Sequence, residues 1–160
     1  MTEALQPVYP IFLTGLERKL TVVVGGGSVG ERKILGLLAA QAQVRLISPQ
    51  ATPTLQQAAQ AGTIEWRPRP YQPGDLSGAW LAFAATDQRA VNALVAQEAH
   101  MRGILCNVAD RAGDGDFHTP AVHRQDGLVF AIGSSGRNPG RIKRVRDWLV
   151  QLCTKFDIPP

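Results

Sequence analysis

One short segment near the N-terminus restricts the fold more than any other part of this 160-residue chain. Residues 20–24 (Leu-Thr-Val-Val-Val) form an apolar, β-branched run that is typical of a buried parallel strand and stops at three glycines, residues 25–27. Ile34, Leu37 and Leu38 then recur at helical spacing among good helix formers. The segment therefore predicts a strand, a tight turn and a helix.

The alternation of strands and helices continues to about residue 108. A helix is expected after Thr52 as N-cap and Pro53 at its first position, with Gly62 beyond its end, and a second helix over 89–102. Further strands are expected over 43–48, where Pro49 would end the strand, and over 63–67, 80–85 and 104–108. This order predicts an α/β fold, a doubly wound parallel sheet with helices on both faces, whose ligand lies at the carboxyl ends of the strands.

The pattern changes after Asp110. Strands over 121–124 and 128–133 flank Asp126-Gly127, a pair that predicts a hairpin turn, and a helix with apolar residues at spacings of three and four opens at Asn138-Pro139. One hairpin and one helix are too small to be stable alone. We therefore expect a main domain over residues 1–112 and, over 113–160, a region that docks on that domain or on a second subunit, which favours a homodimer.

Composition leaves several partners open. The net charge is +4, and a segment from Arg137 to Arg146 holds five cations and no acid. This charge suits nucleic acid, an acidic membrane surface or a small polyanionic substrate. No apolar run is long enough to span a bilayer and residues 1–10 do not resemble a signal peptide, so a cytoplasmic location is expected. Cys106 and Cys153 have neither a redox nor a zinc spacing and are expected to be buried thiols.

The glycines of the first segment carry a recognisable pattern, Gly25-x-Gly27-x-x-Gly30, between a predicted strand and a predicted helix. In a dinucleotide-binding turn the first glycine permits the tight bend, the second lets the pyrophosphate approach the backbone, and the third lets helix and strand pack closely. The amides of Ser28 and Val29 would lie at the positive end of the helix. The pattern therefore predicts a site for a dinucleotide such as NAD.

The acid that usually follows the second strand and binds the ribose is absent. Ser48-Pro49 stands there instead, so backbone groups or the Ser48 hydroxyl would serve the ribose. Arg45 is an alternative ligand for a 2′-phosphate, although a mid-strand arginine commonly lies on a solvated face. The choice between NAD and NADP stays open.

Two polar segments, Thr86-Asp87 and Asn107 to Asp110, follow predicted strands at the edge where such sheets bind ligands. Asp110 is the candidate proton acceptor, while Asp87 precedes a helix and is expected to cap it. His100, His118 and His123 lack a metal-binding spacing, so no metal site is predicted. The segment from Ser134 to Pro139 places serine hydroxyls next to the N-terminus of the basic helix, and these groups together suit a ligand with carboxylates or phosphates.

Taken in order, these pieces resemble the precorrin-2 dehydrogenase and sirohydrochlorin ferrochelatase family of sirohaem synthesis, which includes the N-terminal module of sirohaem synthase. The resemblance spans nearly the whole chain. The matching residues are Tyr9-Pro10-Ile11-Phe12-Leu13, Val22 to Lys33, Ser48-Pro49, Ala84-Ala85-Thr86-Asp87, Asn92, Asn107-Val108-Ala109-Asp110, Phe117, Pro120-Ala121 and Ser134-Ser135-Gly136 through Pro139.

The resemblance implies an NAD-binding Rossmann domain over 1–112, a dimerisation region over 113–160, and NAD-dependent dehydrogenation of precorrin-2 to sirohydrochlorin, with Fe²⁺ insertion as a further expected activity. It implies Asp110 as the catalytic aspartate of both reactions. It also implies NAD bound at Gly27, Ser28, Val29, Ser48 and Pro49, and Ser134 near the tetrapyrrole. Together with the glycine pattern, the strand-end positions and the basic segment, this predicts two sites. The expected cofactor site is formed by Gly25, Gly27, Ser28, Val29, Gly30, Ser48, Pro49 and Thr86, and the expected tetrapyrrole site by Asn107, Ser134, Arg137 and Arg146. The alternative hypothesis is a non-catalytic module that senses a dinucleotide or binds nucleic acid through its basic helix.

Overall fold

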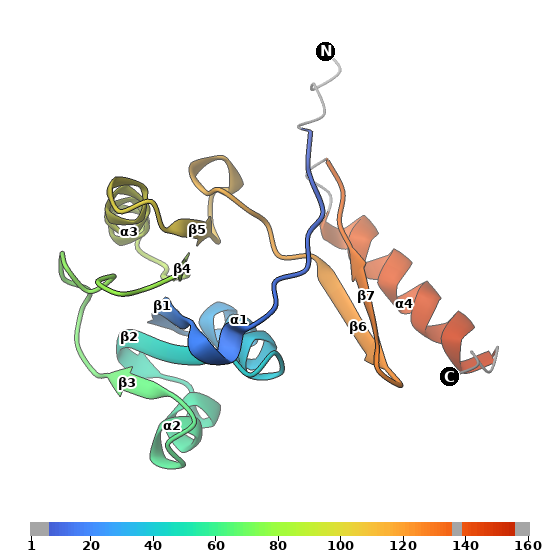
Figure 1. The fold of residues 1–160 in the computed structure, drawn as a ribbon, viewed down its shortest axis with the longest axis horizontal. Helices are drawn as coiled ribbons and strands as arrows, with labels where there is room; N and C mark the ends of the chain where they lie inside the picture. The colour runs from blue at the N-terminus through green and yellow to red at the C-terminus, as the bar shows by residue number, and fades with distance from the viewer. Residues whose placement is uncertain (1–6, 136–138, 156–160) are drawn as a thin grey trace. The chain divides into compact units, whose positions relative to one another are not determined.

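The computed structural model describes residues 7–135 and 139–155. Within these residues the chain forms two compact units (Figure 1). The larger unit spans Leu13–His118. The smaller unit consists of residues up to Phe12 together with those from Thr119 onward.

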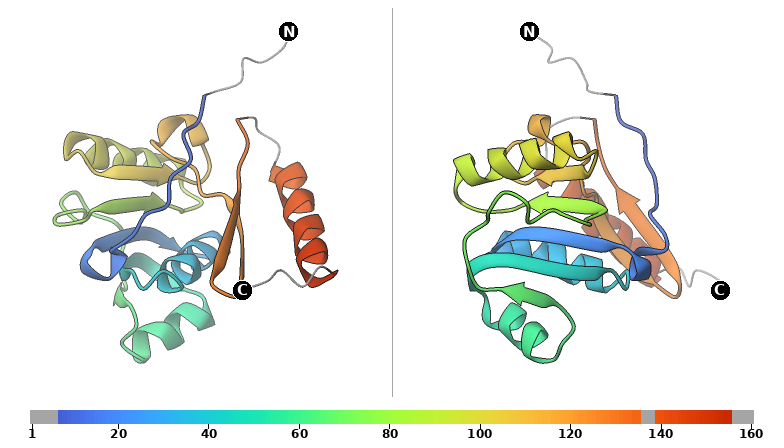
Figure 2. Two further views of the ribbon diagram at one scale, coloured as in Figure 1. Left: turned by 45° about the vertical axis from the view of Figure 1, so that its right-hand side comes forward. Right: turned by 60° about the vertical axis from the view of Figure 1, so that its left-hand side comes forward.

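A five-stranded parallel sheet organises the larger unit, with the strand order β3-β2-β1-β4-β5 (Figure 2). The chain runs outward from β1 to β3, returns to β4 beside β1, and runs outward again, so its direction reverses between β1 and β4. The predicted doubly wound fold is thus confirmed. The strands are β1 Leu20–Gly26, β2 Gln43–Ala51, β3 Glu65–Arg67, β4 Leu81–Ala84 and β5 Leu105–Val108; the helices are α1 Ser28–Leu38, α2 Pro53–Gln60 and α3 Arg89–Met101, with short 3₁₀ turns η1 Leu16–Arg18 and η2 Ala112–Asp114.

The core has two layers because side chains of a strand alternate between the faces of a sheet. Val23 of β1 packs in one layer with Ile34 of α1 and Leu55 of α2. Val22 and Val24 of the same strand pack in the other layer, where α3 covers the sheet. Figure 1 shows α1 and α3 on opposite sides of the sheet.

The first two strands are longer than predicted. β1 does not stop at the glycines but includes Gly25 and Gly26, and β2 does not stop at Pro49 but continues to Ala51. The pairing steps from Val24–Ile47 to Gly26–Ala51, so β2 carries two extra residues in a bulge. Pro49 lies in that bulge, where its missing N–H breaks no ladder bond.

The predicted start of α2 is confirmed, since the Thr52 hydroxyl accepts a hydrogen bond from the Leu55 N–H at 3.4 Å. Helix α3 was expected from its apolar spacing, yet two of those apolar residues, Leu94 and Met101, are exposed. The buried face of α3 consists of Asn92, Val95, Glu98 and Ala99. Two polar residues occupy this face because hydrogen bonds to neighbouring loops satisfy both side chains.

The smaller unit consists of a hairpin, β6 Ala121–Gln125 and β7 Leu128–Ile132, and a helix, α4 Pro139–Lys155. The hairpin turn is confirmed: Asp126 and Gly127 have positive φ angles of 48° and 79°, as a tight hairpin turn requires. Several apolar side chains of this unit are exposed, among them Leu128, Val129 and Trp148. In the described part of the chain, no helix has the length and apolar character to cross a membrane.

Candidate active site

The glycine turn joins β1 to α1 at the carboxyl edge of the sheet. Gly25 has a φ of +112°, and a side chain there would collide with the Ala85 carbonyl of the neighbouring strand end. A side chain at Gly30 would collide with the Gly25 carbonyl. These two glycines therefore bring strand, turn and helix into close contact, as the pattern predicted.

Gly27 differs from the other two glycines because a side chain there would point into solvent, where a ligand could bind, and would not collide with the protein. It is exposed at the N-cap of α1 with ordinary extended backbone angles, φ −79° and ψ −172°, and an added Cβ would meet no protein atom within 4 Å. The first-turn N–H groups of Ser28 and Val29 have no acceptor within the helix. An open surface beside such amides fits the pyrophosphate of a dinucleotide.

Ser48 lies beside the glycine turn but is almost fully buried. Its hydroxyl oxygen accepts a hydrogen bond from the Gly26 N–H at 3.0 Å, and its carbonyl accepts one from the Trp66 indole at 3.0 Å. Pro49, the next residue, is exposed. Ser48 thus holds β2 against the turn, and the hydroxyl hydrogen remains available for a second bond.

Arg45 lies three residues before Ser48 on β2. Its Nε is 2.8 Å from a carboxylate oxygen of Glu65 on the adjacent strand. The arginine therefore forms a cross-strand ion pair, which leaves the hypothesis of a 2′-phosphate ligand without structural support.

Asp110 follows β5 at the same edge of the sheet, and one of its oxygens is fixed by Asn92 of α3. The Asn92 amide nitrogen donates to Asp110 Oδ1 at 2.9 Å and to the Thr86 carbonyl at 3.0 Å. The Asn92 oxygen accepts from the Thr86 hydroxyl at 2.7 Å and from its N–H at 3.1 Å. All the hydrogen-bonding groups of this fully buried amide are satisfied, so the Asp110 carboxylate is held in one orientation.

The second oxygen of Asp110 faces a cation. Arg89 Nη1 lies 3.4 Å from Asp110 Oδ2, while the Nη2 of the same arginine pairs with Asp114 of η2. Through this ion pair Arg89 holds the pKa of Asp114 below its usual value. Sequence reasoning missed both Arg89 and Asp114, because their pairing depends on how the loop after β5 folds back toward α3.

Asn107, another predicted residue at this edge, and Asp116, which was not predicted, stabilise the loop after β5. The Asn107 amide donates to the Phe117 carbonyl at 2.7 Å, and Asp116 accepts from the Cys106 N–H at 2.9 Å. Burial raises the pKa of the Cys106 thiol to about 12, which makes it inert at neutral pH. Asp87 was expected to cap α3, and this is wrong: Gln88 is the N-cap, and its N–H bonds to the Thr86 hydroxyl at 3.1 Å.

The remaining predicted ligands belong to the smaller unit. Arg146 of α4 pairs with the adjacent Asp147, with its Nη2 2.6 Å from Oδ1. Ser134 lies after β7, and Arg137 lies outside the described residues. Among the residues that the structure describes, no three His, Cys, Asp or Glu side chains are grouped so that they could hold a metal ion.

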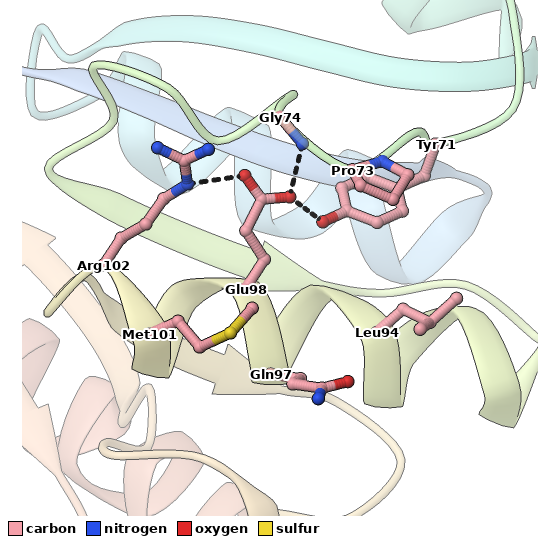
Figure 3. Close-up of a pocket in the computed structure, with 8 residues that line it drawn as sticks. All are labelled: Tyr71, Pro73, Gly74, Leu94, Gln97, Glu98, Met101 and Arg102. Atoms are coloured by element: carbon pink, nitrogen blue, oxygen red, sulfur yellow. Dashed lines mark hydrogen bonds and ion pairs between the residues drawn. The ribbon is translucent and has the colours of Figure 1, made fainter.

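A cavity of about 320 Å³ lies between α3 and the loop before β4, and none of the predicted site residues lines it (Figure 3). Glu98 points from α3 toward this loop, where it binds the Tyr71 hydroxyl and the Gly74 N–H; its other oxygen binds Arg102 at 2.7 Å. These bonds tie the loop to the helix. Glu98 is six residues further along α3 than Asn92, which contacts Asp110, and its hydrogen bonds join α3 to the loop before β4.

The sheet order, the reversal between β1 and β4, and the glycine turn together define a Rossmann-type dinucleotide-binding protein. Consistent with this, a model of the family described as "Putative NAD(P)-binding" matches residues 12–121. That range covers more than half of the chain, and the chain belongs to this family.

The chain is also similar to individual curated proteins and to a solved structure. The chain is 41% identical over 143 residues to "Siroheme synthase 1" of Aeromonas salmonicida and 40% identical over 144 residues to "Siroheme synthase" of Chromobacterium violaceum. These matches cover 89% and 90% of the chain but only 30% of each relative. The chain is also similar to the solved structure of "SirC, precorrin-2 dehydrogenase", with a TM-score of 0.77 and 25% identity over 93% of this chain and 71% of that one.

Proposed function

We propose that this protein oxidises precorrin-2 to sirohydrochlorin with NAD⁺ as the acceptor. The observation that carries the proposal is the Asp110 carboxylate, which Asn92 and Arg89 hold at the same sheet edge as the glycine turn. In an open α/β sheet this edge is where cofactor and substrate meet. The likeness to siroheme synthases and to a precorrin-2 dehydrogenase supports the choice of substrate.

The chain's own residues supply binding and proton transfer. The amides of Ser28 and Val29 would hold the pyrophosphate of NAD beside Gly27. Gly25 and Gly30 shape the turn, and Ser48, Pro49 and Thr86 would border the site. Dehydrogenation removes two hydrogens from the substrate: a bound NAD⁺ would supply the acceptor for one of them as hydride, and Asp110 accepts the other as a proton. A placed carboxylate of this kind typically contributes about 10²–10⁴-fold in rate.

The substrate carries several carboxylates, and the basic residues of the smaller unit suit such a polyanion. We assign Asn107, Ser134, Arg137 and Arg146 to tetrapyrrole binding. Asp110 would also accept pyrrole protons if Fe²⁺ is inserted as a second substrate. The test of that step is the loss of free Fe²⁺ and the appearance of sirohaem absorbance with purified sirohydrochlorin.

We further propose that residues 1–112 bind NAD and that residues 113–160 form a homodimer interface. The support is the exposed apolar surface of the hairpin and α4, which includes Val122, Val129 and Trp148. A hairpin and one helix bury too little apolar surface to be stable unaided. Light scattering at micromolar concentration should give twice the monomer mass, and a clean monomer would refute the interface.

The function is tested by mixing the protein with precorrin-2 and NAD⁺ and following the absorbance of NADH. We expect NADH and sirohydrochlorin to form in equal amounts. If NAD⁺ binds in calorimetry while precorrin-2 is left unchanged, the enzymatic assignment fails, and the alternative of a dinucleotide-sensing or nucleic-acid-binding module becomes the better account.

A further inference from the structure

Arg89 contacts two carboxylates at once, and the two contacts are unequal. Its Nη2 makes a close ion pair with Asp114, whereas its Nη1 lies 3.4 Å from Asp110 Oδ2, near the limit of a hydrogen bond. The shorter contact raises the pKa of Arg89 and lowers that of Asp114. Asp114 therefore competes with Asp110 for the same guanidinium.

Few other charges lie near Asp110 in the part of the chain that the structure describes. Arg111, the next residue, has its Nε 3.6 Å from Asp114 Oδ1, so it also faces Asp114. Asp116 is directed toward the backbone N–H of Cys106, and Asp87 is exposed in the loop before α3. Arg89 is thus the cation in direct contact with Asp110, and Asp114 is the anion that shares it.

We propose that Arg89 and Asp114 act as a pair of positioning residues that sets the pH range in which Asp110 accepts a proton. This inference rests on the proposed role of Asp110 as the base. Arg89 favours the ionised carboxylate of Asp110, and Asp114 draws the guanidinium away, so the two side chains act on proton uptake by Asp110 in opposite directions. Asn92 fixes the other oxygen and leaves Oδ2 as the atom that receives the proton.

Substitutions of Arg89 and of Asp114 should shift the acid limb of the kcat/KM profile in opposite directions. Replacing Arg89 by Gln removes the cation and should move the acid limb of the kcat/KM profile to higher pH by about half a unit, as expected for a partly exposed pair. Replacing Asp114 by Asn frees Arg89 for Asp110 and should move the limb to lower pH by a similar amount. In the variant that carries both Arg89→Gln and Asp114→Asn, the acid limb should lie near that of the parent. Arg89→Lys retains the positive charge, so its acid limb should also stay close to that of the parent.

The matched control is Arg18→Gln, because Arg18 is an exposed arginine that precedes β1 at the opposite edge of the sheet. It removes the same charge and should leave the acid limb unchanged. The titration midpoint of the Asp110 carboxyl, followed by ¹³C NMR in the protein without substrate, gives a second readout that needs no activity.

The experiment combines both readouts for the parent, Arg89→Gln, Asp114→Asn and the control. Opposite shifts of the NMR midpoint and of the acid limb support the inference. If neither variant moves the midpoint, or both move it in the same direction, the inference is overturned even though the dehydrogenase may stand. If the midpoint shifts in opposite directions but the acid limb does not follow, Asp110 is not the base and the proposed mechanism fails instead.

Discussion

The amide nitrogen of Asn92 lies 2.9 Å from Oδ1 of Asp110, and this bond ties helix α3 to the loop that follows β5. The same amide nitrogen donates to the Thr86 carbonyl after β4. One buried side chain therefore joins the ends of two neighbouring strands and orients the proposed catalytic carboxylate.

Replacing Asn92 by Asp should be strongly destabilising at neutral pH. The change turns both donor contacts, to Thr86 and to Asp110, into contacts between acceptors, and it buries a new negative charge. We expect a loss of about 2–4 kcal/mol in the free energy of unfolding at pH 7. Because the new carboxyl would be protonated in acid, the loss should shrink as the pH falls.

Urea unfolding of the Asn92→Asp variant at pH 7 and pH 5 measures this effect. Gln88→Glu, an exposed substitution at the start of the same helix, adds the same charge and serves as the control. Equal stability of the two variants would show that the Asn92 bonds contribute nothing to the fold.

The two glycines Gly27 and Gly30 should respond differently to substitution by Val. At Gly27 the added side chain meets open space and ordinary backbone angles, so the fold should keep its stability within about 0.5 kcal/mol, while NAD⁺ binding weakens at least tenfold, by about 1.4 kcal/mol or more. At Gly30 the side chain would collide with the Gly25 carbonyl, so the fold itself should be destabilised.

Calorimetry with NAD⁺ and thermal unfolding separate these outcomes. A folded Gly27→Val protein that binds NAD⁺ as the parent does would place the cofactor elsewhere. A Gly30→Val protein with parent stability would contradict the close approach of α1 to the turn.

Much of this arrangement could be predicted from the sequence, because apolar periodicity and glycine spacing are local signals. The exact strand ends could not: Gly25, Gly26 and Pro49 break strands by local preference, yet the bulge in β2 and the pairing of Gly26 with Ala51 keep them in the sheet. Asn92 did carry a signal, since it shares a helical face with Val95 and Ala99. Arg89 and Asp114 carried no such sequence signal, because their contact joins segments 25 residues apart in the chain.

The loop before β4 should depend on an ionised Asp75. This carboxylate is 6% exposed and accepts hydrogen bonds from the Arg69 guanidinium at 2.7 and 2.5 Å and from the Gln72 N–H at 2.8 Å. The hydrogen bonds from Arg69 hold the pKa of Asp75 below its usual value. Its contribution to stability is therefore full above the pKa of the unfolded chain and is lost as the pH falls through the lower pKa of the folded protein.

Replacing Asp75 by Asn should cost about 1–3 kcal/mol at pH 7, and the difference from the parent should disappear well below about pH 4. Unfolding by urea across this pH range checks the prediction, with Asp126→Asn in the exposed hairpin turn as control. A pH-independent difference would mean that the ionisation of Asp75 is irrelevant.

Thr21 on β1 is fully buried, and its hydroxyl has no hydrogen-bond partner among the described residues. Replacement by Val keeps the shape and removes the unsatisfied group, so the protein should gain about 1 kcal/mol. Thr63→Val is the matched control and should lower the stability of the protein, because the Thr63 hydroxyl donates a hydrogen bond to the Ala58 carbonyl at 2.8 Å. Thermal unfolding of both variants tests the pair, and a destabilised Thr21→Val protein would contradict it.

The most direct test of the proposed dehydrogenase is the rate of NADH formation from precorrin-2 by the parent and by the Asp110→Asn variant. Asparagine keeps the size of the side chain, and its amide oxygen can still accept the hydrogen bond from the Asn92 amide nitrogen, but it cannot accept the proton. The variant should therefore fold, bind NAD⁺ as the parent does, and react about 10²-fold more slowly or worse. A variant that retains the parent rate would contradict the account. If Asp87→Asn lost the rate instead, the base would lie in the loop before α3.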